Sequence, residues 1–159
     1  MSPDGRAAVR RICFSCPPDL PAKSGRFHKG SGKTKNMVDL ANSRIDEAHG
    51  SVVFINKNHR LMYDLKYKIR VVCMEEYEHI TNSDEYIGFL YGIISSDHDI
   101  ETIFIDSILK HADINVQDIP PFLDRLENLS KKYDIEFFVS LSADKDELGD
   151  AIKKFGIIN

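Results

Sequence analysis

Short apolar runs alternate along the chain with stretches in which apolar residues recur at helical spacing. The apolar runs predict buried strands at residues 51–55, 69–74, 102–105 and 135–141. Helical spacing and one capping box predict helices at residues 33–48, 84–96, 118–133 and 144–155. Strands that alternate with helices are typical of a parallel sheet covered on both faces. The pattern therefore predicts an α/β fold, a three-layer sandwich with a parallel sheet of about four or five strands.

Two of the predicted helices carry residues with a specific structural meaning. Gly88 and Gly92 lie one turn apart, and this spacing predicts that their helix approaches a neighbour closely. Asp118 is the predicted N-cap of the next helix. Pro120 and Pro121 suit its first turn, because no backbone N–H there needs a partner within the helix.

Residues 1–26 differ from the rest of the chain. They hold four of the six prolines and show little periodicity, so most of the segment is predicted to be irregular. Residues 9–14 alone could form a short strand. We therefore expect an atypical N-terminal segment at 1–26 and a single domain at 27–159.

Charge and composition restrict the classes of partner. The chain carries 21 basic and 25 acidic residues, a net charge of −4, which disfavours general binding to nucleic acids or anionic membranes. No apolar stretch approaches the roughly 18 residues that a membrane span requires. Three cysteines are too few for a disulfide framework in a chain of this length. A cytoplasmic protein is the expectation.

A glycine-rich motif directly precedes the first predicted helix. The glycines allow a sharp turn whose N–H groups point inward, the lysine can reach the β- and γ-phosphates of a nucleotide, and the threonine hydroxyl can ligate Mg2+. The helix that follows adds its positive dipole end. Two further lysines flank the motif and raise the local positive potential. The predicted nucleotide-binding residues are Lys29, Gly30, Ser31, Gly32, Lys33, Thr34 and Lys35.

The match to the phosphate-binding loop is incomplete. The full pattern is G-x-x-x-x-G-K-[ST], and Phe27 stands where its first glycine belongs. A glycine-rich turn that merely caps a helix, with a solvated lysine, is the alternative. The surrounding α/β pattern favours the phosphate-binding interpretation.

Asp106 is the predicted metal-side carboxylate. It follows the apolar run at 102–105, so it would lie at the carboxyl edge of the sheet, where open α/β sheets bind ligands. Phosphate-binding loops are commonly paired with such an acid, which holds Mg2+ and its water shell. Capping of the next turn is the alternative role. We predict Thr34 and Asp106 as the metal pair, and Lys33 and Asp106 as the residues on which any catalysis depends.

No residue is identifiable as the group that orients a hydrolytic water. Many nucleotide hydrolases place a glutamate directly after the metal-side aspartate, but Ser107 occupies that position here. Glu75 and Glu76 follow another predicted strand and are the nearest acidic alternatives, although the sequence favours a solvated helix start for them. Ser140 and Ser142 could sense the γ-phosphate or cap the last helix.

Two further features are weaker. Cys13 and Cys16 have Cys-x-x-Cys spacing but no second pair at zinc spacing, which disfavours a metal or redox role. The histidines are scattered, and His28 is at most a neighbour of a bound phosphate.

From Lys29 to about Phe155 the chain resembles short bacterial P-loop proteins that are described as ATP-binding or as similar to twitching-motility ATPases. The resemblance rests on K-G-S-G-K-T at 29–34, V-V-F-I at 52–55, Tyr63-Asp64, Glu76-Tyr77, Gly88-Phe89-Leu90, the segment Phe104 to Lys110, Phe122 to Leu126 and Ser142-Ala143-Asp144. It implies a P-loop sheet of the additional-strand type, with ATP as the favoured nucleotide and Mg2+ as its metal.

The chain departs from that family before the loop. Family members begin with an apolar strand that runs straight into the loop, whereas residues 21–26 here cannot form one. The first strand is therefore expected to be atypical or missing, unless residues 9–14 take its place, and an altered start of the chain would explain the departure. The expected function is Mg-dependent binding of ATP or GTP, with slow ATP hydrolysis, or alternatively a non-catalytic regulatory or interaction module with a degenerate nucleotide site.

Overall fold

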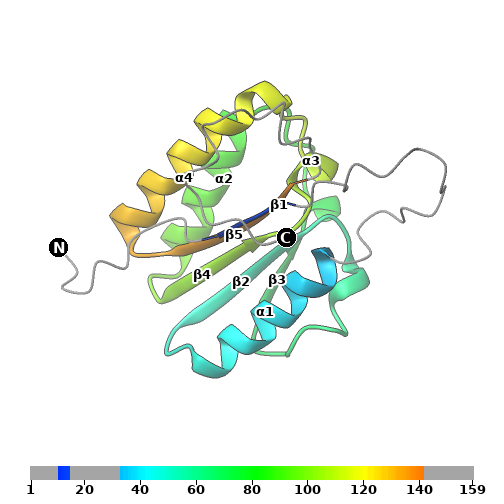
Figure 1. Cartoon of the computed structure of the whole chain (residues 1–159), viewed down its shortest axis with the longest axis vertical. Coiled ribbons are helices and arrows are strands. Elements are labelled where there is room, and N and C mark those ends of the chain that lie inside the picture. Colours follow the sequence, from blue (N-terminus) through cyan, green and yellow to red (C-terminus); the bar gives the residue numbers. More distant parts are fainter. Residues whose placement is uncertain (1–10, 15–32, 142–159) are drawn as a thin grey trace.

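The computed structural model describes residues 11–14 and 33–141. Its centre is a sheet of five parallel strands in the order β1-β5-β4-β2-β3 (Figure 1). The strands are β1 (Arg11–Phe14), β2 (Ser51–Asn56), β3 (Arg70–Cys73), β4 (Ile100–Ile105) and β5 (Glu136–Leu141). The prediction of an α/β fold with a parallel sheet is confirmed.

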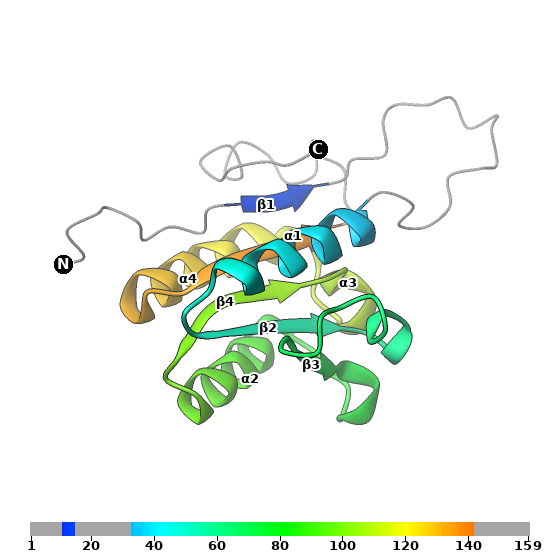
Figure 2. The ribbon, with the colours of Figure 1, turned by 90° about the horizontal axis from the view of Figure 1, so that it is seen from below.

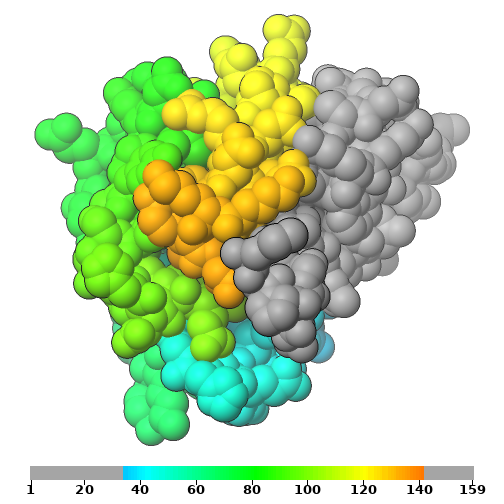
Figure 3. Space-filling view, turned by 90° about the vertical axis from the view of Figure 1, so that its left-hand side faces the viewer, coloured from blue at the N-terminus to red at the C-terminus, as the bar shows by residue number. Residues whose placement is uncertain are grey.

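Helices cover both faces of the sheet, as predicted. They are α1 (Lys33–Glu47), α2 (Ser83–Ser96), α3 (Ile108–His111) and α4 (Ile119–Tyr133), with short 3-10 turns η1 (His59–Leu61), η2 (Met74–Glu76) and η3 (Val116–Asp118). Figure 2 shows α1 and α2 on opposite sides of β2 and β4. The helix α4 lies beside α2, and the two form adjoining parts of one surface (Figure 3). The helix predicted at 144–155 lies outside the described residues.

The strand β1 pairs with β5 and supplies the first strand that was expected to be atypical or missing. Ile12 pairs with Val139, and Phe14 pairs with Leu141. Of the two alternatives, the one in which residues 9–14 supply a strand is correct for Arg11–Phe14. Residues 15–32, between this strand and α1, lie outside the described part of the chain.

An aromatic ladder binds three strands together beneath α1. Phe54, Phe104 and Phe138 are paired in register across β2, β4 and β5. Their rings stack with centroid separations of 5.7 Å between Phe54 and Phe104 and 4.7 Å between Phe104 and Phe138. Met37 and Ala41 of α1 are fully buried in the same cluster. Stacked rings add to the burial of their area, so this ladder fixes α1 against the middle of the sheet.

The second core lies on the opposite face and includes one buried polar pair. The Tyr86 hydroxyl of α2 and Nε2 of His111 in α3 lie 2.8 Å apart, and the Phe122 ring of α4 meets Tyr86 edge-on. The other ring nitrogen of His111, Nδ1, has no hydrogen-bond partner among the described residues. Protonation of His111 would place a positive charge in this buried position, away from water, which is unfavourable.

Two predictions about α2 and α4 are wrong in detail. A Cβ added to Gly88 or Gly92 would meet nothing within 4 Å, so these glycines face outward and do not permit close packing. Asp118 does precede α4, but its side chain makes no capping hydrogen bond. Its backbone is already right-handed helical because it closes η3, whereas a side-chain N-cap requires an extended backbone.

Because Gly88 and Gly92 are exposed inside a helix, alanine at either position should stabilise the protein. We expect the free energy of unfolding to rise by roughly 0.5–1 kcal/mol for Gly88→Ala and for Gly92→Ala. The matched control is Gly50→Ala, where the new Cβ would lie 2.0 Å from the Asp99 carbonyl oxygen and should destabilise. Urea denaturation measures all three; a loss of stability in both helix variants would contradict the outward orientation.

The environment of His111 predicts a pH-dependent stability. Burial, and secondarily the positive charges of Lys57 and His79, lower the pKa of His111 from 6.5 to about 4. The unfolded chain therefore binds the extra proton first, so this stabilisation is complete above pH 6.5 and is lost as the pH falls towards 4.

We expect the free energy of unfolding to fall by about 2 kcal/mol more in the native protein than in His111→Gln between about pH 7.5 and about pH 5. Glutamine does not titrate, and its amide can still contact the Tyr86 hydroxyl. Denaturant titrations at both pH values give the difference. Equal losses in the two proteins would show that His111 accepts a proton readily in the folded state.

Candidate functional site

The predicted metal pair comes together at the carboxyl edge of the sheet. Thr34 lies in the first turn of α1, and its hydroxyl Oγ1 donates to Oδ2 of Asp106 over 3.3 Å. The two residues are 72 positions apart in the chain. Asp106 follows β4 directly, and its backbone N–H donates to the Ile55 carbonyl of β2 over 2.9 Å. Helix packing and strand order together create this contact.

Asp106 is a buried carboxylate, only 3% exposed. A buried carboxylate is stable only where hydrogen bonds or cations compensate its charge. Thr34 donates to one of its oxygens, and Ser140 of β5 donates to the other, Oδ1, over 3.0 Å. Donors from two elements therefore fix the plane of the carboxylate in advance of any ligand.

Ser140 has a second role at this edge. Its hydroxyl oxygen accepts a hydrogen bond from the Ser107 N–H over 2.7 Å. Ser107 has a left-handed backbone, with φ 53° and ψ 55°, which a residue other than glycine adopts at a cost of about 1 kcal/mol. The hydrogen bond from Ser107 helps to hold this sharp turn, which leads the chain away from the sheet immediately after Asp106.

The role of Ser140 was only partly foreseen. The sequence leaves two roles open for Ser140, sensing a γ-phosphate or capping the last helix, whereas the structure shows its hydroxyl hydrogen-bonded to Asp106 and Ser107. A polar residue near the end of an apolar strand was the available signal. Its partner depends on β5 lying beside β4, which the sequence alone did not establish. Ser142 lies outside the described residues.

Of the predicted phosphate loop, only the end that enters α1 lies among the described residues. Lys29, Gly30, Ser31 and Gly32 lie outside the described residues, as does the side chain of Lys33. The backbone of Lys33 begins α1, whose first turn carries no acidic residue. The first N–H groups of a helix have no partners within the helix, and together with the helix dipole they favour an anion at this end. Lys35 is exposed in the same turn.

The Thr34–Asp106 pair has the chemistry and spacing of a magnesium site. Mg2+ prefers oxygen ligands at about 2.1 Å in octahedral geometry, which places adjacent ligand oxygens about 3 Å apart. The 3.3 Å between Thr34 Oγ1 and Asp106 Oδ2 is close to that value. Thr34 could ligate the ion directly, and Asp106 could hold it directly or through its water shell.

The alternative acids for orienting a water lie elsewhere on the edge. Glu75 and Glu76 belong to η2, after β3, and are exposed. Because β2 separates β3 from β4, they are two strands away from Asp106, about 10 Å at normal strand spacing. Glu76 forms an ion pair with His59 over 2.7 Å. The structure does not bring either glutamate to the Thr34–Asp106 pair.

The remaining candidates stay untested. Cys13 lies in β1, whereas Cys16 and His28 are outside the described residues.

No helix in the described part of the chain is long and apolar enough to span a membrane. No family model matches the chain, and no curated protein matches it.

Removing the Ser140 hydroxyl should destabilise the fold. Ser140→Ala deletes a hydrogen bond to a buried carboxylate and leaves the Ser107 N–H unpaired, so we expect a loss of about 3 kcal/mol in the free energy of unfolding. The matched control is Ser130→Ala: Ser130 is 1% exposed, and its hydroxyl has no partner among the described residues. That control should change stability by less than about 0.5 kcal/mol or raise it. Equal effects of the two changes in urea denaturation would refute the role given to Ser140.

Proposed function

We propose that the chain is a P-loop protein that binds ATP or GTP with Mg2+ at the carboxyl edge of its sheet. The observation that carries the proposal is the hydrogen bond between Thr34 and Asp106. In a P-loop site both residues are needed at the same ion.

The proposed roles follow from position and charge. The backbone N–H groups of Gly30, Ser31 and Gly32 would surround the phosphates, with Lys33 at the β- and γ-phosphates. The positive end of α1 points to the same place. Thr34 and Asp106 would hold Mg2+, which neutralises charge between the β- and γ-phosphates. Lys29 and Lys35 would add positive potential around the loop.

The order of strands supports this assignment. The strand β5 lies between β1 and β4, the strand that ends at Asp106. This is the arrangement implied by the resemblance to additional-strand P-loop proteins, in which a strand separates the first strand from the one bearing the metal-side acid. The resemblance also favours ATP over GTP.

Such a site could serve either of two functions. The protein could hydrolyse the nucleotide slowly, or it could be a non-catalytic regulatory or interaction module. A specific observation favours the regulatory module: Ser107 occupies the position after Asp106, and its N–H is engaged by Ser140. Glu75 and Glu76 lie two strands away. Steady-state release of phosphate faster than that of a Lys33→Ala variant would instead establish a slow ATPase.

Calorimetric titration of Mg-ATP tests the proposal. We expect the native chain to bind with micromolar affinity, about 8 kcal/mol, and Lys33→Ala to bind at least about 100-fold more weakly because the phosphate charge loses its partner. Asp106→Asn should bind ATP with little dependence on Mg2+, since an amide is a much poorer partner for the ion.

The matched control is Lys68→Ala. Lys68 is exposed and precedes β3, at the opposite edge of the sheet, so its loss should leave the affinity unchanged. Absence of binding to the native chain would refute the proposal. Equal weakening in Lys33→Ala and Lys68→Ala would indicate only general attraction between phosphate and positive charge.

A further inference from the structure

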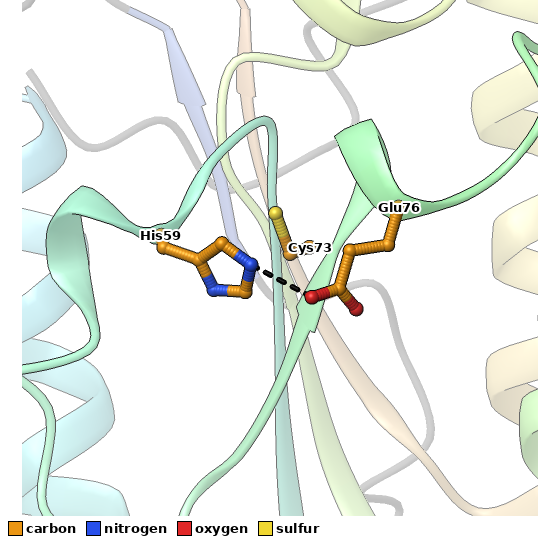
Figure 4. Close-up of side chains that lie close together, drawn as sticks. All are labelled: His59, Cys73 and Glu76. Atoms are coloured by element: carbon orange, nitrogen blue, oxygen red, sulfur yellow. Dashed lines mark ion pairs between the residues drawn. The ribbon is translucent and has the colours of Figure 1, made fainter.

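Three side chains of different chemistry converge where β2 and β3 end. His59 belongs to η1, Cys73 is the last residue of β3, and Glu76 closes η2. One ligand atom of each lies within 4.8 Å of the other two. Figure 4 shows the His59 ring and the Glu76 carboxylate facing each other, with the Cys73 sulfur close by.

The backbone holds these segments together independently of any ligand. The Cys73 thiol contacts the Lys57 carbonyl oxygen at 3.5 Å, and the Glu75 N–H donates to the same oxygen over 3.0 Å. The Asn58 side chain accepts a hydrogen bond from the Arg60 N–H over 3.1 Å, which fixes the turn that carries His59. The backbone around His59, Cys73 and Glu76 is thus fixed by the paired ends of β2 and β3 and by the capped turn that carries His59.

Of the three side chains, Cys73 is buried whereas His59 and Glu76 are about half exposed. Cys73 is 3% exposed, whereas the side chains of His59 and Glu76 are 50% and 53% exposed. The sulfur therefore lies at the base of the group, and the two half-exposed side chains lie on its solvent side. An ion could enter between them without unfolding any element.

From this geometry we propose that His59, Cys73 and Glu76 form a Zn2+ site, with water as the fourth ligand. Thiolate, imidazole and carboxylate are the ligands of tetrahedral zinc, and three protein ligands leave one position open. Zinc bonds of about 2.0–2.3 Å separate neighbouring ligand atoms by about 3.5 Å. His59 Nε2 and Glu76 Oε1 are 2.7 Å apart, so binding needs a small outward rotation of two half-exposed side chains. The thiol proton leaves to solvent as the zinc–sulfur bond forms.

The zinc proposal is independent of the proposed nucleotide site. Zinc would bind through one sulfur, one nitrogen and one oxygen, whereas the Thr34–Asp106 pair offers only oxygen, which suits Mg2+. The two sites lie on β3 and β4, with β2 between them. If the experiment refutes one of the two proposed sites, the proposal for the other site therefore still stands.

A matched control exists in the same fold. His79 Nε2 and Asp113 Oδ2 form an ion pair at 2.9 Å, similar to the pair of His59 and Glu76. Among the described residues, His59, Cys73 and Glu76 are the only three histidine, cysteine or carboxylate side chains that cluster closely enough to hold a metal ion together. His79→Gln thus removes an exposed histidine–carboxylate pair without touching the sulfur-containing group.

The experiment uses the full chain with Cys13→Ser and Cys16→Ser, so that Cys73 is the sole remaining thiol of the three cysteines. Zn2+ is titrated by calorimetry, and Co2+ is added as a spectroscopic probe. We expect one equivalent of Zn2+ to bind and Co2+ to give a thiolate charge-transfer band with tetrahedral ligand-field absorption. At free zinc about 100-fold above Kd, Tm should rise by roughly 8 °C.

Variants decide which residues hold the ion. His59→Gln and Glu76→Gln, both at exposed positions, should each lower the zinc affinity at least ~100-fold, because loss of even a supporting partner costs 10–100-fold. His79→Gln should leave the affinity unchanged. Absence of zinc binding, absence of the thiolate band with Co2+, or equal weakening in His59→Gln and His79→Gln would each overturn the proposal.

Discussion

The buried carboxylate of Asp106 is the constraint on which the functional edge depends. A charge that is 3% exposed must be compensated by groups fixed around it. Thr34 and Ser140, which come from a helix on one face and a strand of the sheet, supply two of these groups. If either α1 or β5 shifted, the carboxylate would lose a donor. The position of α1 is therefore coupled to the sheet by a polar contact as well as by packing.

The packing that supports this contact is aromatic and lies between α1 and the sheet. Phe104 of β4 stacks on Phe54 and Phe138, and α1 covers the same cluster. Arg44 of α1 extends over the Phe138 ring and pairs with Glu136 at the start of β5 over 2.7 Å. The helix is thus anchored near both ends, to Asp106 at its first turn and to β5 at its last. Such two-point anchoring orients the N-terminal end of α1 towards the edge where a phosphate would bind.

Periodicity predicted the elements well because burial on a covered sheet leaves unbroken apolar runs. It located Asp106 at a strand end for the same reason. Strand order is a property of long-range pairing, however, and the contact of Ser140 with Asp106 follows only from β5 lying beside β4. The orientation of Gly88 was misjudged because spacing along a helix does not show which face meets a neighbour. The sequence does not indicate the group of His59, Cys73 and Glu76, because its three members come from separate short elements, two of them 3-10 turns.

Parallel strands explain why two different ligand chemistries arise at one edge. Every strand of this sheet ends on the same side, so each loop that follows a strand contributes polar groups to a common rim. After β4 the rim presents hydroxyl and carboxylate oxygens, which suit a hard ion beside phosphate. After β2 and β3 it presents a thiol, an imidazole and a carboxylate, which suit zinc. The strand β2 lies between the two groups and pairs with both β3 and β4, so the same backbone pairing holds each group in its own part of the rim.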